Sequence, residues 1–123
     1  MLNGKSILIT GGTGSLGKAL TKTILEKFPQ VKRLVIFSRD EQKQFQMSSE
    51  FSNPQIRYII GDVRDVESLK RAFQGIDYVI HTAAMKHVHL CEYNPDECVK
   101  TNIGGAQNVI KASFETKVER VVS

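Results

Sequence analysis

Short apolar runs alternate along the chain with segments in which apolar residues recur at helical spacing. The apolar runs predict strands at Ser6–Thr10, Arg33–Ser38, Ile56–Gly61, Asp77–Ala84 and from Glu119 onward. The helical spacing predicts helices over Ser15–Phe28, Asp40–Phe51, Asp65–Phe73 and Pro95–Glu115. Pro29 ends the first helix, Asp65 is suited to cap the third, and Pro95 is suited to open the fourth.

This alternation predicts an α/β fold, because strands separated by helices form βαβ units in a parallel sheet. Right-handed crossovers restrict the topology to a Rossmann-type doubly wound sheet, with an expected strand order of 3-2-1-4-5. We interpret residues 1–123 as a single domain, because the chain has an ordinary domain length and shows no repeat, low-complexity segment or linker.

Composition narrows the class of protein. A hydrophobic share of 41% with 24% charged residues is typical of a soluble globular chain, and no apolar run is long enough for a membrane span or a secretory signal. Cys91 and Cys98 fit neither a disulfide framework nor a closed zinc site, and His87 and His89 lack a third ligand, so we expect no metal. We therefore expect a cytoplasmic protein.

The positive charge of the chain is dispersed rather than clustered. The net charge is +4, but the 17 basic residues are spread along the sequence. Nucleic-acid binding requires clustered basic residues, so we expect no nucleic-acid partner and favour an anionic small molecule.

The strongest chemical signal is a glycine-rich turn. Gly11, Gly14 and Gly17 follow the first strand directly and open the first helix. Glycines at this spacing allow a tight turn, close approach of the backbone to a diphosphate, and close helix–strand packing. The free N–H groups of Ser15–Gly17 then face the diphosphate at the positive end of the helix dipole. The alternative is a turn whose glycines serve packing alone.

The end of the second strand predicts which dinucleotide is bound. NAD-binding sheets place an acid there, whereas this chain has Ser38 followed by Arg39. A guanidinium suits a 2′-phosphate, and Lys43 adds a second positive charge, so we favour NADP over NAD. The alternative is that Arg39 pairs on the surface with Asp40 or Glu41.

Two further strand ends offer cofactor contacts. Asp62 and Val63 follow the third strand, where a carboxylate and a backbone N–H can meet the adenine. Ala83 and Ala84 end the fourth strand, where small side chains let the ribose pass. The alternatives are that Asp62 caps a helix and that the alanines only pack tightly.

The motifs TGGTGSLG, SRDE, GDVRD, AAMKHV, EYNP and KTNIGGAQNVI together resemble the extended short-chain dehydrogenase/reductase superfamily. Within it, the chain is most similar to the inverting UDP-N-acetylglucosamine 4,6-dehydratases of bacterial pseudaminic-acid and related polysaccharide biosynthesis. The resemblance covers all 123 residues. It implies a lyase in which NADP⁺ takes a hydride from carbon 4 of the sugar, water is eliminated, and the hydride returns to carbon 6.

The resemblance also implies roles for individual residues. Thr13 to Leu16 would hold the diphosphate, Arg39 to Gln44 would surround the 2′-phosphate, and Lys86 would reach the cofactor or the UDP-N-acetylglucosamine. The predicted cofactor-binding residues are Gly11, Thr13, Gly14, Ser15, Leu16, Gly17, Arg39, Asp40, Glu41, Lys43, Gln44, Asp62, Val63, Ala83, Lys86 and Asn102.

The chain departs from the family pattern in two respects. Thr82, His89 and Cys91 stand where the family commonly has alanine, proline and alanine. The catalytic Asp-Lys pair and the Tyr-x-x-x-Lys motif of the family have no counterpart in these 123 residues. We therefore expect an N-terminal fragment, inactive alone, of an enzyme that is a homo-oligomer at full length. The alternatives are a nucleotide-sugar epimerase or reductase of the same superfamily, and a non-catalytic dinucleotide-sensing module.

Overall fold

The computed structural model describes residues 2–82 and 105–122. Its strands are β1 (Ser6–Thr10), β2 (Arg33–Ser38), β3 (Ile56–Ile60), β4 (Tyr78–His81) and β5 (Arg120–Val122). Its helices are α1 (Ser15–Lys27), α2 (Glu41–Glu50), α3 (Val66–Ala72) and α6 (Gly105–Glu115). The part of the fourth predicted helix that precedes Gly105 lies outside the described residues.

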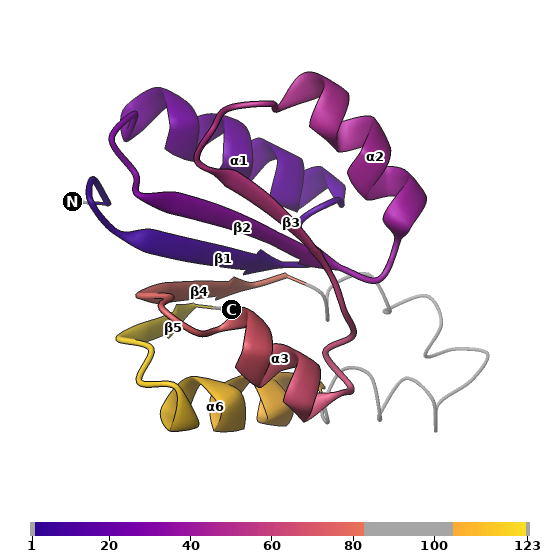
Figure 1. Ribbon diagram of the computed structural model, residues 1–123, viewed down its shortest axis with the longest axis vertical. Coiled ribbons are helices and arrows are strands. Elements are labelled where there is room, and N and C mark those ends of the chain that lie inside the picture. Colours follow the sequence, from indigo (N-terminus) through magenta and orange to yellow (C-terminus); the bar gives the residue numbers. More distant parts are fainter. Residues whose placement is uncertain (1, 83–104, 123) are drawn as a thin grey trace.

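The five strands form one sheet in the order β3-β2-β1-β4-β5, and every neighbouring pair is parallel. The prediction of a doubly wound sheet with order 3-2-1-4-5 is therefore confirmed. Leu8 at the centre of β1 pairs in register with Val35 of β2 and Val79 of β4. All strands point the same way, so their carboxyl ends lie along one edge of the sheet (Figure 1).

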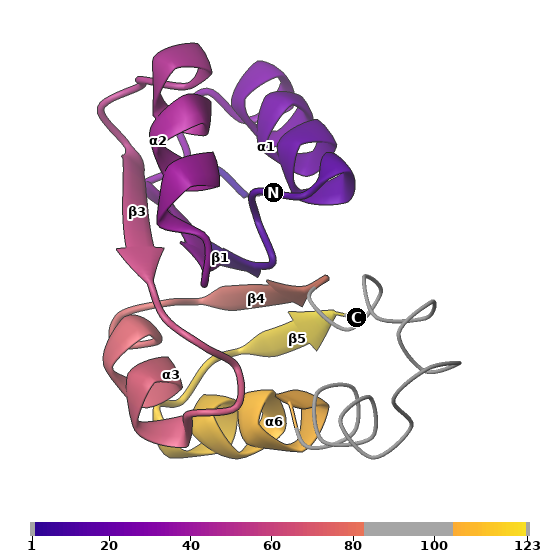
Figure 2. The same ribbon diagram turned by 90° about the vertical axis from the view of Figure 1, so that its right-hand side faces the viewer.

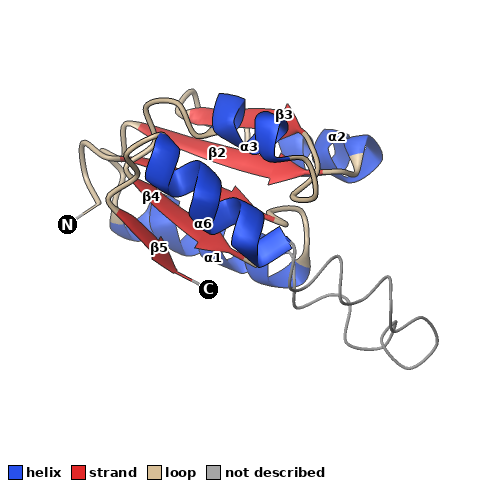
Figure 3. Cartoon of the chain, turned by 90° about the horizontal axis from the view of Figure 1, so that it is seen from below, coloured by secondary structure: helices blue, strands red, loops and turns tan. Residues whose placement is uncertain are grey.

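Helices cover both faces of the sheet. Helices α1 and α2 lie on one face, and α3 and α6 lie on the other (Figures 1 and 2). Figure 3 looks onto the α3 and α6 side, with α1 behind the strands. One core joins strand residues such as Ile9 and Ile36 to Ile24 of α1 and Met47 of α2. The second core joins Leu8, Val35, Phe37 and Val79 to Leu69, Phe73, Val109 and Ala112.

Capping aspartates explain where helices α2 and α3 begin. The Asp65 carboxylate accepts from the backbone N–H of Glu67 at 3.1 Å and of Ser68 at 3.4 Å, so the predicted cap of α3 is confirmed. Asp40 caps α2 in the same way, accepting from the N–H of Lys43 at 3.0 Å. Such caps satisfy N–H groups that the helix itself leaves without a partner.

Part of the apolar pattern of the first helix is exposed rather than buried. Leu16 is 45% exposed and Ala19 is exposed, whereas Gly17, Thr21 and Ile24 are buried against the sheet.

No helix among the described residues combines the length and the apolar character needed to cross a bilayer.

Helix α1 approaches the turn before it so closely that only glycine fits at position 17. A Cβ added to Gly17 would lie 2.5 Å from the carbonyl carbon and the Cα of Gly12. A Cβ on Gly12 would in turn lie 2.7 Å from Cγ2 of Ile36. Both glycines thus bring the start of α1 directly against the carboxyl ends of β1 and β2.

We predict that Gly17→Ala destabilises the protein by about 1–3 kcal/mol, the usual cost of overpacking a tight interior. The new methyl group meets backbone atoms, which cannot rotate away as a side-chain end can. Urea unfolding followed by circular dichroism measures the change. Lys22→Ala, at an exposed position of the same helix, is the control and should stay within about 0.5 kcal/mol. Equal stability of Gly17→Ala and the wild type would contradict the close approach.

Candidate functional site

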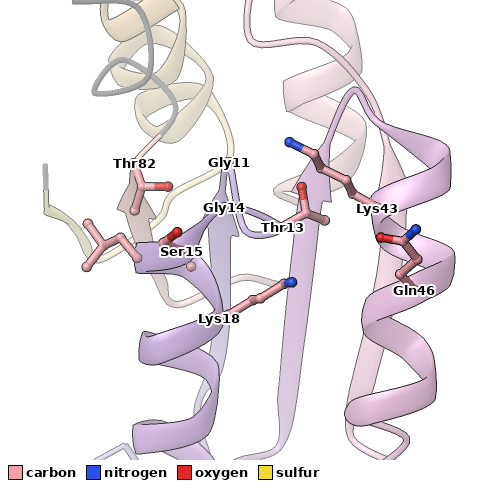
Figure 4. Close-up of a pocket in the computed structure, with 10 residues that line it drawn as sticks. Gly11, Thr13, Gly14, Ser15, Lys18, Lys43, Gln46 and Thr82 are labelled. Carbon is pink, nitrogen blue, oxygen red and sulfur yellow. The ribbon is translucent and has the colours of Figure 1, made fainter.

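A cavity of about 440 Å³ opens at the carboxyl end of β1, between the starts of α1 and α2 (Figure 4). Most of its lining comes from the turn after β1 and the start of α1, and the rest comes from α2 and from the residue that follows β4. The lining residues are Gly11, Thr13, Gly14, Ser15, Leu16, Gly17, Lys18, Lys43, Gln46 and Thr82. In open α/β sheets this position, outside the carboxyl ends of the strands, is where ligands bind.

The turn itself depends on backbone conformations that favour glycine. Gly11 has a φ of 65°, in the left-handed region that side chains rarely adopt. The N–H of Gly14 donates to the carbonyl of Gly11 at 3.1 Å, which closes the turn, and the N–H of Gly12 donates to the carbonyl of Phe37 in β2 at 3.3 Å. The turn is therefore anchored to β2 of the sheet.

The first turn of α1 has N–H groups without a side-chain cap. Gly14 occupies the N-cap position, and among the described residues no side chain accepts a capping hydrogen bond there. No acidic residue lies in the first turn either. The positive end of the helix dipole therefore faces the cavity without compensation, which is the usual arrangement for binding a phosphate.

Thr13 places a buried hydroxyl group beside the cavity. The residue is only 3% exposed, and its Oγ1 makes no hydrogen bond with the described residues. A buried hydroxyl without a partner costs free energy, and an oxygen-rich ligand in the cavity would relieve that cost.

The predicted 2′-phosphate residues at the end of β2 are only partly brought to the cavity. Lys43 lines it, whereas Arg39, Asp40 and Glu41 are exposed and are not among its lining residues. The Gln44 side chain is buried, and its Nε2 donates to Ser38 Oγ at 3.0 Å and to the Ile59 carbonyl at 2.8 Å. Gln44 thus ties α2 to the ends of β2 and β3.

Asp62 is held by two arginines at the end of β3. The Arg64 side chain donates to Asp62 Oδ1 at 3.2 Å and to Oδ2 at 2.9 Å, and the Arg64 N–H donates to Oδ1 at 2.9 Å. Arg39 Nη1 lies 3.9 Å from Asp62 Oδ2, so the ion pair that Arg39 forms here is with Asp62 and not with Asp40 or Glu41. Partial burial alone raises the pKa of Asp62, but the hydrogen bonds from Arg64 and the charges of both arginines lower it overall.

The alternative role considered for Asp62, as a helix cap, is wrong, because Asp65 caps α3. Val63 is buried in the core, and its carbonyl accepts from Asn108 Nδ2 of α6 at 3.0 Å. Whether Asp62 and Val63 also contact an adenine remains a prediction.

Of the predicted cofactor-binding residues, the cavity is lined by Gly11, Thr13, Gly14, Ser15, Leu16, Gly17 and Lys43. The other described ones do not line it: Arg39, Asp40, Glu41, Gln44, Asp62 and Val63. Ala83, Lys86 and Asn102 lie outside the described residues, as do His87, His89 and both cysteines. Sequence reasoning did not assign Lys18, Gln46 or Thr82 to this site. Lys18 and Gln46 could have been found from helical periodicity, because they share the helix faces of Ser15 and Lys43.

A buried polar network joins the ends of β1 and β4 beside the cavity. Thr10 Oγ1 accepts from the N–H of Thr82 at 3.1 Å and lies 2.7 Å from His81 Nδ1, and Thr82 Oγ1 donates to the Thr10 carbonyl. His81 Nε2 is buried without a partner among the described residues. Burial lowers the pKa of His81 below its ordinary value of 6.5 and so favours the neutral imidazole in the folded chain.

Comparison with known proteins gives a consistent family match. Residues 7–123 match the family described as "Polysaccharide biosynthesis protein". The chain is 58% identical over 123 residues to the UDP-N-acetylglucosamine 4,6-dehydratase (inverting) of Campylobacter jejuni, covering 100% of this chain and 36% of that protein. It is 46% identical over 120 residues to the UDP-glucose 4-epimerase of Rickettsia canadensis, covering 96% of this chain and 35% of that protein. The chain thus spans about a third of these relatives.

Solved structures share the fold. Pen from Bacillus thuringiensis superimposes with a TM-score of 0.91 at 49% identity, covering 98% of this chain and 37% of that one. The dTDP-glucose 4,6-dehydratase DesIV from Streptomyces venezuelae, with NAD and TYD bound, superimposes with a TM-score of 0.81 at 25% identity, covering 94% and 38%.

We predict that the free energy of unfolding falls as the pH drops below 6.5, partly because of His81. The pKa of His81 is lower in the folded chain than in the unfolded chain, so the unfolded chain binds the proton first as the pH falls. The contribution of the neutral His81 to the free energy of unfolding is therefore full above pH 6.5 and is lost as the pH falls toward the folded pKa. Urea unfolding between about pH 7.5 and 5 should show a smaller decline for His81→Gln than for the wild type. Parallel declines would contradict a neutral, buried His81.

Proposed function

This chain belongs to the polysaccharide biosynthesis protein family, and from that premise we propose that it binds the nicotinamide dinucleotide of a nucleotide-sugar 4,6-dehydratase. The observation that carries the proposal is the cavity at the start of α1, where the helix N–H groups and the Thr13 hydroxyl have no side-chain partner among the described residues. These are donors aimed at one oxygen-rich ligand. Residues 1–123 form the dinucleotide-binding domain in this proposal.

The residues present fit a dinucleotide at this position. A Cβ at Gly12 or Gly17 would collide with neighbouring atoms. Because these positions are glycine, no side chain covers the backbone of the turn, and a diphosphate can approach it closely. No acidic side chain occurs among the described residues that line the cavity. The cavity is therefore suited to an anion in shape and in charge.

Each part of the cofactor has assigned residues in this proposal. The N–H groups of Ser15 to Gly17 and the Thr13 hydroxyl bind the diphosphate, and the 2′-phosphate end lies toward Arg39 and Lys43. Asp40, Glu41 and Gln44 shape the start of α2 around that end. Asp62 and Val63 face the adenine, while Ala83, Asn102 and Lys86 complete the site, Lys86 also reaching the sugar nucleotide.

We favour NADP over NAD. The end of β2 has no carboxylate for the ribose hydroxyl, since Ser38 stands there and its hydroxyl is bonded to Gln44. Arg39 and Lys43 supply positive charge nearby. The solved relatives described with NAD, such as DesIV at 25% identity and WbmG of Bordetella bronchiseptica at 28%, are distant enough to differ at these positions.

The proposed substrate is UDP-N-acetylglucosamine, the substrate in the name of the Campylobacter jejuni relative. When bound, the dinucleotide supplies a hydride acceptor that later returns the hydride, so the net reaction is the elimination of water. This chain's residues bind and orient the cofactor, and the complete gene product carries the lyase activity as a cytoplasmic homo-oligomer.

A second candidate is a nucleotide-sugar 4-epimerase, because the chain is also 46% identical to a protein named UDP-glucose 4-epimerase. Product analysis distinguishes the two. A dehydratase converts UDP-N-acetylglucosamine to a product lighter by one water, whereas an epimerase leaves the mass unchanged. Mass spectrometry of the reaction of the complete gene product therefore decides between them.

We predict that NADP⁺ raises the melting temperature of the complete gene product more than NAD⁺ does at equal concentration. A ligand that binds only the folded state stabilises it by about 2.7 kcal/mol at a concentration 100-fold above Kd. Differential scanning fluorimetry with each nucleotide measures the shift. No shift with either nucleotide would contradict the proposed function, and a larger shift with NAD⁺ would contradict the choice of NADP alone.

The variant Thr13→Val tests the contribution of the Thr13 hydroxyl in the same experiment. Valine has nearly the same shape but no hydroxyl, so the melting temperature without ligand should be unchanged or raised, because a buried unpartnered group is removed. The shift with NADP⁺ should shrink, because a donor to the diphosphate is lost. A shift equal to that of the wild type would remove Thr13 from the site.

A further inference from the structure

Two lysines from different helices line the cavity. Lys18 comes from the start of α1, and Lys43 from the start of α2, with Gln46 one turn further along. In Figure 4 both lysine side chains extend from their helices into the space between α1 and α2. Sequence reasoning assigned Lys43 to the adenosine end of the ligand but gave Lys18 no role.

Lys18 stands where a cation is unfavourable unless an anion is nearby. Its own N–H donates to the carbonyl of the N-cap residue Gly14 at 2.9 Å, so it belongs to the start of the helix. The amino end of a helix is partially positive and repels a lysine side chain. An anion bound beside the Lys18 and Lys43 side chains would offset that repulsion.

The direction of Lys18 is set by the backbone of α1. Gly17 is pressed against Gly12, and this contact leaves helix α1 little freedom to rotate about its axis. The residue that follows Gly17 is Lys18, which lines the cavity. Lys18 is therefore held at the cavity by a rigid element rather than by a loop.

Arg39, the other cation of this region, is directed elsewhere. Arg39 lies 3.9 Å from Asp62 and is not among the residues that line the cavity. The nearby Asp40 carboxylate is engaged as the cap of α2. Within the described part of the chain, the cations that line the cavity are thus Lys18 and Lys43.

Resting on the proposed function, we infer that Lys18 is a specificity-determining residue that binds the 2′-phosphate of NADP together with Lys43. An ammonium group on a flexible stem binds phosphate as a point charge and does not require a planar partner. The diphosphate, which NADP and NAD share, is bound by the first-turn N–H groups and Thr13 instead. Lys18 therefore contributes to the affinity for NADP and not to that for NAD.

The test is a pair of titrations of the complete gene product with NADP⁺ and NAD⁺, followed by isothermal calorimetry. Lys18→Gln should weaken NADP⁺ binding by about tenfold, as expected for one charge-assisted hydrogen bond, and change NAD⁺ binding less than twofold. Lys22→Gln is the matched control, because Lys22 is exposed on the same helix, carries the same charge and does not line the cavity. It should leave both affinities unchanged.

The outcomes separate the inference from the proposed function. Equal losses for both nucleotides in Lys18→Gln would overturn the inference by placing Lys18 at the diphosphate, and no loss for either would remove it from the site. In both cases the proposed function would stand. A wild-type protein that binds neither nucleotide would overturn both. Lys18→Arg should retain the preference for NADP⁺, which guards against a loss caused by misfolding.

Discussion

The contact between the backbones of Gly17 and Gly12 is the constraint on which the rest of the site depends. No side chain separates helix α1 from the turn at the end of β1, and a single added methyl group would lie 2.5 Å from backbone atoms. Because the helix starts so close to the sheet, its uncapped N–H groups, the buried Thr13 hydroxyl and the Lys18 side chain all reach one cavity. Glycine at position 17 is thus required for packing and also lines the cavity of the proposed site, so the packing alternative and the binding interpretation do not exclude each other.

The parallel sheet supplies the frame around that contact. Its two faces are sealed by separate cores, one with α1 and α2 and one with α3 and α6. The carboxyl edge is instead held by polar links between neighbouring strands, including Thr10 with His81 and Thr82, and Gln44 with Ser38 and Ile59. These links hold the strand ends at fixed positions while leaving the cavity between α1 and α2 open to a ligand. A rigid edge with an open cavity is what a nucleotide-binding domain requires.

Much of this arrangement was predictable from sequence, because it depends on local signals. Alternating apolar runs and the cap Asp65 define the elements, and right-handed crossovers then determine the strand order. Contacts between elements were less predictable. The sequence did not reveal that the Gln44 side chain is buried between α2 and the ends of β2 and β3. Leu16 fits the apolar pattern yet is 45% exposed and lines the cavity. Periodicity tells which residues share a helix face, but the rotation of each helix against the sheet depends on packing that no single segment encodes. That rotation also directs Lys18 toward the cavity.

The central claim is that the glycine-rich turn holds a dinucleotide by its diphosphate. The most direct measurement is a crystal structure of the complete gene product with NADP⁺. The account predicts a diphosphate within hydrogen-bonding distance of the N–H groups of Ser15 and Leu16 and of the Thr13 hydroxyl. A diphosphate bound elsewhere, with the cavity at the start of α1 occupied only by water, would contradict it.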